Sequence, residues 1–524
     1  MPLDEKMNVI RETQSICPEC NKVLPAKIFE KDGKVWIEKE CQDHGRFEEL
    51  YWGSYDMYLR ASGFKLEGKG IENPSIKKEI VNCPSDCGLC KDHLTHTTLA
   101  NIVVTNRCDL SCWYCFFYAE RSGYVYEPSL EQIREMARNL RNERPVRGNA
   151  VQLTGGEPCL REDLTEIIKA IKEEGIEHVQ LNTDGIRLAT DPTLAKRVRE
   201  AGTNTVYLSF DGLTPKTNPK NHLEIPAILE NFRGAGLGIV LVPTIIKSIN
   251  DHEVGSIINF ASRNIDVIRG VNFQPVSLTG RLTRAERDKY RITIPDVIQR
   301  IEEQTNGEIK RDDFYPVPCT GPMTRFVEAL TGRAHYELSV HFACGAATYL
   351  FKEDDRLIPL TRFVDIDGLF EYLTEKTDDI KGGKNKYWVA IKVLSKLGKF
   401  IDKEKQPKGM NLSKIIFNVL LRHNYNALGD FHHKSLFIGM MHFMDKYNYD
   451  IERLRRCGIH YLVPNGLIIP FCAFNVIPEW YRDKIQKEFG MSIEDWEKKN
   501  GRKIKDDFYI RKVKREALVE PKVA

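Results

Sequence analysis

Strand-like apolar runs alternate with helix-like segments through the middle of the chain. The runs typical of buried strands lie at 99–105, 149–154, 178–182, 205–211, 239–246 and 271–275. Between them, segments such as 164–174 and 192–201 carry apolar residues at helical spacing and end at a glycine. Six strand-then-helix repeats predict an α/β fold built on a partial (β/α)6 barrel. Ligand contacts in such a barrel come from the C-terminal ends of the strands.

The pattern changes on both sides of this barrel. A Lys/Glu-rich, hairpin-like stretch lies between two short cysteine knuckles near the N-terminus, and three apolar, helix-like segments follow the barrel at 387–400, 412–421 and 436–443. Two β runs joined by Pro464-Asn465-Gly466 then predict a hairpin. We expect four units: a rubredoxin-like or zinc-ribbon-like domain (1–60), an auxiliary-cluster linker (61–98), the barrel (99–285) and a helical and hairpin domain (286–524).

Length and charge narrow the class of protein. A chain of 524 residues is too long for one ordinary core. Its 77 basic and 74 acidic residues give a net charge of +3, which provides no argument for a nucleic-acid partner. The first 16 residues lack the apolar core of a signal peptide, and no run approaches the roughly 20 apolar residues of a membrane span. We therefore expect a cytoplasmic protein whose 14 cysteines bind metal rather than form disulfides.

The cysteines that matter most directly follow the first barrel run. Cys108, Cys112 and Cys115 have the spacing C-x3-C-x2-C. Three thiolates in one loop can hold three irons of a [4Fe–4S] cluster and leave the fourth iron open for chemistry. A structural zinc site would need a fourth ligand close by, and disulfides pair even numbers of cysteines in an oxidising compartment. The spacing therefore favours the cluster.

A second motif gives this loop a family resemblance. The run at 149–154 ends in Gly155-Gly156-Glu157-Pro158, and paired glycines let a ligand approach the backbone closely. Together the two motifs resemble the radical S-adenosylmethionine (SAM) superfamily. The resemblance implies that the cluster cleaves SAM to a 5′-deoxyadenosyl radical, which removes a hydrogen atom from the substrate. It also implies that Gly155, Gly156 and Glu157 contact the methionine end of SAM, and that Asn182 and Ser209 meet its ribose and carboxylate. Alternatively, Asn182 and Ser209 each cap the helix that follows.

The N-terminal knuckles predict a mononuclear metal site. Cys17, Cys20, Cys41 and His44 are spaced as in small ribbons that bind one tetrahedral ion. Three thiolates and one imidazole suit zinc and iron alike, so the metal stays open. The alternative is a small domain with unmetallated cysteines.

The remaining cysteines predict two auxiliary [4Fe–4S] clusters, which makes three clusters in total. Cys83, Cys87 and Cys90 repeat the C-x3-C-x2-C spacing, with Cys159 as the candidate fourth ligand or, alternatively, a buried packing thiol. Four cysteines remain, which equals one complete ligand set. They are Cys319, Cys344, Cys457 and Cys472. The alternative is four unrelated buried thiols.

The whole arrangement of ribbon, cysteine sets and GGEP-Cys is similar to archaeal radical SAM enzymes that include tetraether lipid synthase. That resemblance implies that the chain joins isoprenoid chain ends of archaeal glycerophospholipids by a C–C bond, with a reductant such as ferredoxin or flavodoxin. Related proteins are also described as methyltransferases acting on a reduced pterin, which is the second hypothesis. A third is an iron–sulfur electron carrier or scaffold, which would not cleave SAM.

The apolar segments after the barrel bear on this choice. The segments from 387 to 422 are also rich in lysine, and a basic amphipathic helix is typical of contact with an anionic membrane. We expect the segments from 387 to 443 to form an apolar lipid channel and the lysine-rich ones to hold the protein peripherally at the inner face of the membrane. The alternative is a helical cap with a solvated lysine face.

Overall fold

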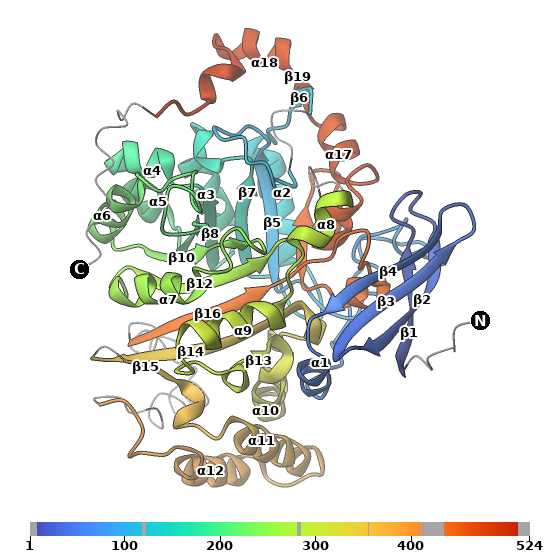
Figure 1. The fold of residues 1–524 in the computed structure, drawn as a ribbon, viewed down its shortest axis with the longest axis vertical. Coiled ribbons are helices and arrows are strands. Elements are labelled where there is room, and N and C mark those ends of the chain that lie inside the picture. The colour runs from blue at the N-terminus through green and yellow to red at the C-terminus, as the bar shows by residue number, and fades with distance from the viewer. Residues whose placement is uncertain are drawn as a thin grey trace.

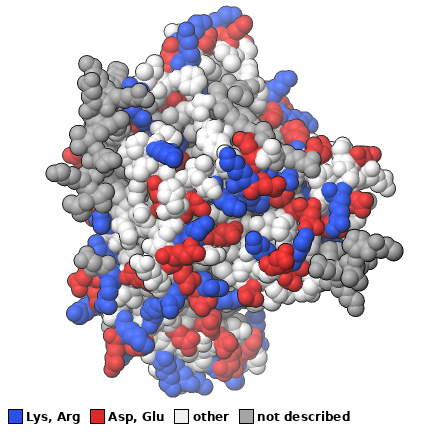
Figure 2. All heavy atoms as spheres, viewed as in Figure 1, with Lys and Arg blue, Asp and Glu red and all other residues white. Residues whose placement is uncertain are grey.

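The computed structural model describes residues 8–117, 122–279, 284–354, 356–408, 412 and 434–511. Within these ranges the strands form a four-stranded sheet, a thirteen-stranded mixed sheet and a two-stranded ribbon (Figure 1). The mixed sheet carries the barrel, and the four-stranded sheet lies at its side. Basic and acidic side chains are interspersed over the visible face of the described chain (Figure 2).

The N-terminal sheet is an antiparallel meander. Its strands are β1 (Asn8–Ile16), β2 (Val23–Lys31), β3 (Lys34–Cys41) and β4 (Gly45–Trp52), in sequence order. Alternate residues of β3, such as Val35 and Ile37, are buried, as expected for a strand with one face on a core. The β1–β2 and β3–β4 turns lie at the same end of the sheet, which brings the two cysteine knuckles together.

The barrel consists of six adjacent parallel strands. They are β5 (Leu99–Thr105), β7 (Ala150–Gly155), β8 (His178–Thr183), β9 (Thr205–Ser209), β10 (Gly238–Val242) and β12 (Ile268–Pro275). The helices of the connections are α2 (Leu130–Arg141), α3 (Leu164–Glu173), α4 (Ile186–Thr190), α5 (Pro192–Ala201), α6 (Ile225–Ala235) and α7 (Val254–Arg263). The partial (β/α)6 barrel expected from the sequence is confirmed.

The same sheet continues beyond both edges of the barrel. Next to β12 lie β16 (Ser435–Met441), β14 (Gly345–Glu353), β13 (Tyr315–Pro316) and β15 (Arg356–Pro359), and next to β5 lie β17 (Ile459–Leu462) and β18 (Ile468–Pro470). β17 and β18 pair as the expected antiparallel hairpin.

The helix expected at 436–443 is wrong, because this segment is strand β16. It pairs in parallel with β12 and antiparallel with β14, so it is an interior strand of the sheet. Leu436, Ile438 and Met440 are at most 2% exposed. A strand covered on both faces has a continuous apolar sequence, which periodicity alone does not separate from a buried helix.

Helices gather at one end of the molecule, at the bottom of Figure 1. They are α10 (Gly321–Thr331), α11 (Ile366–Lys381) and α12 (Lys386–Lys396), with α9 (Ile294–Gln304) nearer the sheet. α12 covers most of the expected helix 387–400 and buries Val389 and Val393 in a cluster with Phe326 and Leu373. The helix expected at 412–421 falls outside the described residues apart from Leu412. None of the described helices combines the length and apolar character needed to cross a membrane.

Buried charges hold the N-terminal sheet against the rest of the chain. The Asp450 carboxylate is fully buried and accepts hydrogen bonds from Arg11 at 2.5 Å, Thr13 at 2.7 Å and Tyr51 at 2.8 Å. The ammonium of Lys39 donates to the carbonyl oxygens of residues 446 and 447, at 2.9 and 2.8 Å. The sheet is thus fixed to the segment that follows β16.

The last described residues, 491–511, cross the barrel at its C-terminal face, and we call them the C-terminal strap. The strap contains β19 (Met491–Ser492), which pairs with β6 (Tyr124–Val125), and α18 (Ile493–Asn500) (Figure 1). Arg107 donates to Asp507 at 2.6 Å, and the backbone N–H of Tyr509 donates to the carbonyl oxygen of Asp109 at 2.9 Å. The strap is therefore attached on both sides of Cys108.

Candidate functional site

Cys108, Cys112 and Cys115 lie in the loop that leaves the C-terminal end of β5. All three are partly buried. The backbone N–H of Phe117 donates a hydrogen bond to the Cys115 sulfur, 3.3 Å away. Burial raises the pKa of Cys112 to about 12, and the nearby Lys220 ammonium opposes this increase. Three thiols in one sheltered loop at the barrel mouth fit the donor set of a [4Fe–4S] cluster with one open iron.

The GGEP loop at the end of β7 lies directly against this cysteine loop. The N–H of Gly156 donates to the carbonyl of Thr105 at 2.9 Å, and the N–H of Glu157 donates to that of Arg107 at 2.7 Å. A Cβ atom on Gly156 would lie 2.0 Å from the Arg107 oxygen. Glycine is therefore required where the two loops touch.

The Glu157 side chain points into the barrel and orders the loop after β8. Its carboxylate accepts hydrogen bonds from the Cys159 N–H, the Thr183 hydroxyl and the Asp184 N–H, each at 2.8 Å. Burial raises the pKa of Glu157 to about 7. Its position beside the cysteine loop is clear, and its expected contact with SAM stays a prediction.

Two carboxyl groups beside Cys108 were not selected from the sequence. One oxygen each of Asp109 and Asp184 and the Cys108 sulfur lie within 4.8 Å of one another. Burial and the neighbouring Asp184 raise the pKa of Asp109 to about 9, and burial and Glu157 raise that of Asp184 to about 7. Each has one buried oxygen without a hydrogen-bond partner among the described residues. Such a pair can accept hydrogen bonds from an amino group.

Asn182 and Ser209 both lie at the barrel mouth, at the ends of β8 and β9. The Asn182 amide donates to the Thr154 hydroxyl at 3.2 Å, and the Ser209 hydroxyl accepts a hydrogen bond from Lys220. Neither residue caps the following helix, because α4 and α6 begin after Gly185 and Glu224. Their expected roles toward SAM stay predictions.

A buried ion pair completes this end of the barrel. The Lys220 ammonium lies 2.7 Å from Asp211, and both side chains are less than 10% exposed. The hydroxyl of Tyr114 donates to the same carboxylate. Asp184 and Asp211 could have been found from their place at strand ends, whereas Lys220 stands in a loop with no motif.

The four ribbon residues come together as expected. The Nδ1 atom of His44 lies 3.6 Å from the Cys17 sulfur and 3.5 Å from that of Cys41, and the sulfurs of Cys20 and Cys41 are 3.9 Å apart. A tetrahedron with Zn–S bonds of about 2.3 Å has edges of about 3.8 Å. The donor set and its spacing therefore fit a single zinc or iron ion.

The Cys83 set is joined by Cys457 from the far end of the chain. A hydrogen bond that Cys87 donates to Cys83 raises the pKa of Cys87, as do burial and the thiols of Cys90 and Cys457. Cys159, the candidate fourth ligand, lies elsewhere: its sulfur is 3.5 Å from the Thr183 hydroxyl in the barrel. His93 links this segment to Cys457, because its backbone N–H donates to the Cys90 carbonyl at 3.1 Å and its ring Nε2 lies 2.8 Å from the Cys457 carbonyl oxygen. Cys457, rather than Cys159, therefore lies beside this set.

Cys344 and Cys472 lie next to Cys457. Burial raises the pKa of Cys472, and Cys457 and Cys344 raise it further. Burial also raises the pKa of Cys319 to about 12, but the charged neighbours of that thiol are Asp367 and Arg60. Cys344, Cys457 and Cys472 thus influence one another, whereas the charged neighbours of Cys319 are different residues.

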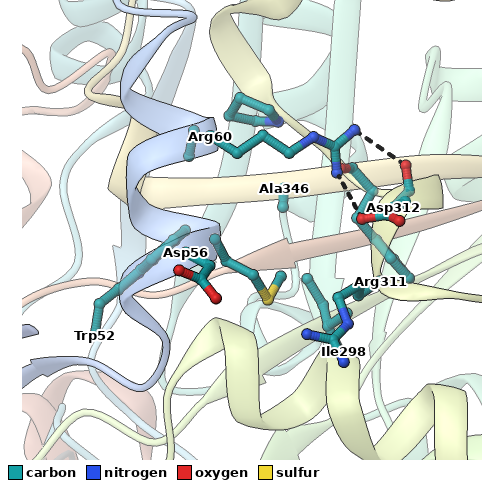
Figure 3. Close-up of a pocket in the computed structure, with 11 residues that line it drawn as sticks. Trp52, Asp56, Arg60, Ile298, Arg311, Asp312 and Ala346 are labelled. Carbon is teal, nitrogen blue, oxygen red and sulfur yellow. Dashed lines mark hydrogen bonds and ion pairs between the residues drawn. The ribbon is translucent and has the colours of Figure 1, made fainter. Parts of the chain in front are cut away.

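A cavity of about 330 Å³ opens at the seam between α1 (Tyr55–Ser62) and the sheet (Figure 3). Trp52 and Met57 form part of its wall, and Arg60 bridges its rim to Asp312 at 3.7 Å. None of the cysteines lines this cavity. The candidate site is accordingly the barrel mouth with its adjoining cysteine groups.

Comparison with known proteins agrees with this geometry. Residues 102–261 match the radical SAM superfamily, and residues 9–53 match the HMPTM N-terminal zinc ribbon domain. The 7,8-dihydro-6-hydroxymethylpterin dimethyltransferase of Methanocaldococcus jannaschii is 45% identical over 93% of this chain and 97% of its own. The GTP 3′,8-cyclase of Marinobacter nauticus is 29% identical over 38% of this chain and 61% of its own. Among solved structures, methylornithine synthase matches with a TM-score of 0.32 at 18% identity, over 40% of this chain and 64% of that one.

These findings correct the expected substrate. A relative that matches almost the full length is named for a pterin, which contradicts the expected glycerophospholipid substrate and the lipid-synthase activity. The expected membrane contact has no support either. One of the three segments that suggested it is the interior strand β16. Helix α12 buries Val389 and Val393 in a protein core, while Tyr387, Trp388 and Ile391 stay exposed.

Proposed function

Because the chain belongs to the radical SAM family that includes the 7,8-dihydro-6-hydroxymethylpterin dimethyltransferase, we propose that it is a methyltransferase acting on a reduced pterin. The observation that carries the proposal is the match over 93% of this chain and 97% of that relative. The match covers the ribbon, the barrel and the cysteine-bearing C-terminal part together, and not the barrel alone.

The residues of the barrel mouth suit this activity. Cys108, Cys112 and Cys115 would hold the [4Fe–4S] cluster, and Asp109 and Asp184 offer free carboxyl oxygens toward an amino group. Together, a bound cluster and SAM supply an adenosyl radical that removes hydrogen atoms from unactivated carbon. The chain's own part is to position the reactants and to exclude water and other hydrogen donors.

Aromatic side chains form a wall between this loop and the auxiliary cysteines. The rings of Phe116, Phe443 and Phe471 lie in mutual contact, with centroids 5.0 to 6.2 Å apart. They belong to one apolar cluster that also contains Cys115 and Cys472. Such a wall would keep a radical away from water and would offer flat surfaces to a flat heterocycle.

The direct test is product analysis. Anaerobically reconstituted protein is incubated with SAM, a one-electron reductant and 7,8-dihydro-6-hydroxymethylpterin, and the pterins are analysed by mass spectrometry. We expect a mass increase of one or two methyl groups together with 5′-deoxyadenosine. The variant with Cys108, Cys112 and Cys115 all replaced by Ala should form neither, whereas Cys319→Ala should retain SAM cleavage.

Two outcomes would contradict the proposal. SAM cleavage with no change in the pterin would mean a different substrate. Absence of SAM cleavage in fully loaded protein would favour an electron carrier or scaffold instead.

A further inference from the structure

We propose that Lys220 sets the reduction potential of the cluster held by Cys108, Cys112 and Cys115, because its buried ammonium stabilises the electron that this cluster accepts. The inference requires the cluster site but not the pterin, so it can be tested without substrate. Lys220 would act only through the charge that it places near the cluster, so it is a positioning residue and not a catalytic residue.

Contacts with the C-terminal strap, with Asp211 and with the cysteine loop hold Lys220 in place. It stands in the loop between β9 and α6, where Arg511 of the C-terminal strap donates to its carbonyl oxygen at 3.0 Å. Its ammonium lies 2.7 Å from Asp211 and 5.4 Å from the centre of the Tyr114 ring. Tyr114 belongs to the cysteine loop, between Cys112 and Cys115. The cation is thus held against that loop and away from solvent.

Asp211 offsets part of the lysine charge, but the ammonium still lies against the cysteine loop, 5.4 Å from the centre of the Tyr114 ring. Replacing Lys220 by an uncharged residue leaves the Asp211 carboxylate there without its cation, so the local charge falls by one unit. Burying an ammonium and a carboxylate costs free energy of desolvation, and a well-packed apolar pair often stabilises a fold as well. An effect of the lysine charge on the cluster would explain why the fold keeps this buried ion pair.

The electron balance is simple. A low-potential one-electron donor is oxidised, and the cluster takes up its electron and gains one negative charge. Coulomb interaction with a cation a few ångströms away is strong where water is excluded, because the effective dielectric constant is low. Net charge near the sulfurs is one of the factors that set the potential of an iron–sulfur cluster. Lys220 should therefore make reduction easier.

The experiment is a redox titration followed by electron paramagnetic resonance, on the full-length, iron-loaded protein without SAM. The signal of this cluster is identified in a parallel sample by its change when SAM is added. Lys220→Met and Lys220→Gln remove the charge, and the glutamine keeps a donor for Ser209. We expect each to lower the ratio of reduced to oxidised cluster about tenfold at fixed potential, a shift of about 59 mV for one electron. Lys220→Arg should restore most of it.

Lys172→Met is the matched control. It removes the same charge from the same barrel, but Lys172 binds the carbonyl of Glu177 and the side chain of Asn204 at the opposite end of the strands. Its potential should equal that of the unchanged protein. An unshifted potential in Lys220→Gln, or an equal shift in Lys172→Met, would overturn the proposal. The proposal would also be overturned if Lys220→Met and Lys220→Gln both lost iron while Lys220→Arg kept its full iron content. In that case the positive charge would be needed to hold the structure of the site, not to set its potential.

Discussion

At the scale of single residues, the ribbon shows how one imidazole completes a set of thiolates. A hydrogen bond from His44 lowers the pKa of Cys41 to about 6, so that this cysteine is ready to bind metal as a thiolate at neutral pH. The spacing of the knuckles predicted this group, because both pairs lie in tight turns whose geometry depends on few neighbours. The two C-x3-C-x2-C sets stay predictions.

We predict that His44→Ala removes one metal ion per chain and leaves SAM cleavage intact, because the ribbon is separate from the barrel mouth. Metal analysis by mass spectrometry would measure the change. His252→Ala, at an exposed histidine, is the control and should keep full metal. Unchanged metal in His44→Ala would mean that the three cysteines suffice or that the ribbon is empty.

We also predict that Gly156→Ala disrupts the barrel mouth. The added Cβ would meet the Arg107 oxygen, so the GGEP loop must move away from the cysteine loop. Iron should fall by up to about four atoms per chain, and SAM binding measured by equilibrium dialysis should be lost. Gly234→Ala in α6, where a Cβ meets open space, should change neither. Full SAM binding in Gly156→Ala would show that the loops tolerate separation.

The residues that sequence reasoning missed share one property. Asp109, Asp184 and Lys220 matter because of what the fold brings near them, and no spacing in the chain records that proximity. Asp109 reaches Asp184 only when β5 and β8 are two strands apart in one barrel. Short-range motifs are therefore readable from sequence, while charge clusters across strands are not.

At the scale of elements, the barrel strands and helices could be predicted because short apolar runs alternate with longer segments that carry apolar residues at helical spacing and end at a glycine. Strand β16 could not. Its apolar sequence satisfies either structure, and only its pairing with β12 and β14 decides between them. The lipid-channel hypothesis depended in part on this misread segment.

We predict that Ile438→Asp abolishes folding of the sheet extension. A carboxylate would be buried in an interior strand without a partner, at a cost of more than about 4 kcal/mol. Ile391→Asp on α12, where the side chain is 54% exposed, should change the unfolding free energy by about 0.5 kcal/mol or less. Thermal unfolding and limited proteolysis would compare the two. Equal unfolding free energies for Ile438→Asp and Ile391→Asp would mean that β16 does not contribute to the core.

The hairpin β17–β18 explains why widely spaced cysteines can serve one site. Because β17 pairs with β5, the turn before it carries Cys457 to the Cys83 set, across more than 350 residues of sequence.

We predict that Cys457→Ala lowers iron content, measured by colorimetric iron assay against protein, and abolishes pterin methylation while uncoupled SAM cleavage continues. Three [4Fe–4S] clusters would hold about 12 irons. The iron content of the matched variant Cys319→Ala tests whether Cys319 is a ligand of one of them. Full iron and full turnover in Cys457→Ala would make it a packing residue.

At the scale of the whole molecule, the ribbon is fixed to the barrel by buried charge. Burial opposes ionisation of Asp450, but Arg11, His341 and Thr13 together outweigh it and hold the pKa at about 2. We predict that Asp450→Ala lowers the unfolding free energy by about 3 to 5 kcal/mol, since it leaves buried donors unpaired. Glu48→Ala, which breaks the exposed pair with Lys31, should cost about 1 kcal/mol or less. Urea unfolding followed by tryptophan fluorescence would separate them, and equal midpoints would show that this seam does not limit stability.

The C-terminal strap has a consequence for how the protein is made. Its contacts with Arg107 and Asp109 clasp both neighbours of Cys108, yet its residues follow the whole barrel in the sequence. The barrel and its cysteine loop are therefore synthesised before the strap and stay unclasped until the strap has been made. An iron–sulfur cluster can be inserted most easily in that interval. If the strap binds before the cluster is inserted, the strap must detach again before the cluster can enter.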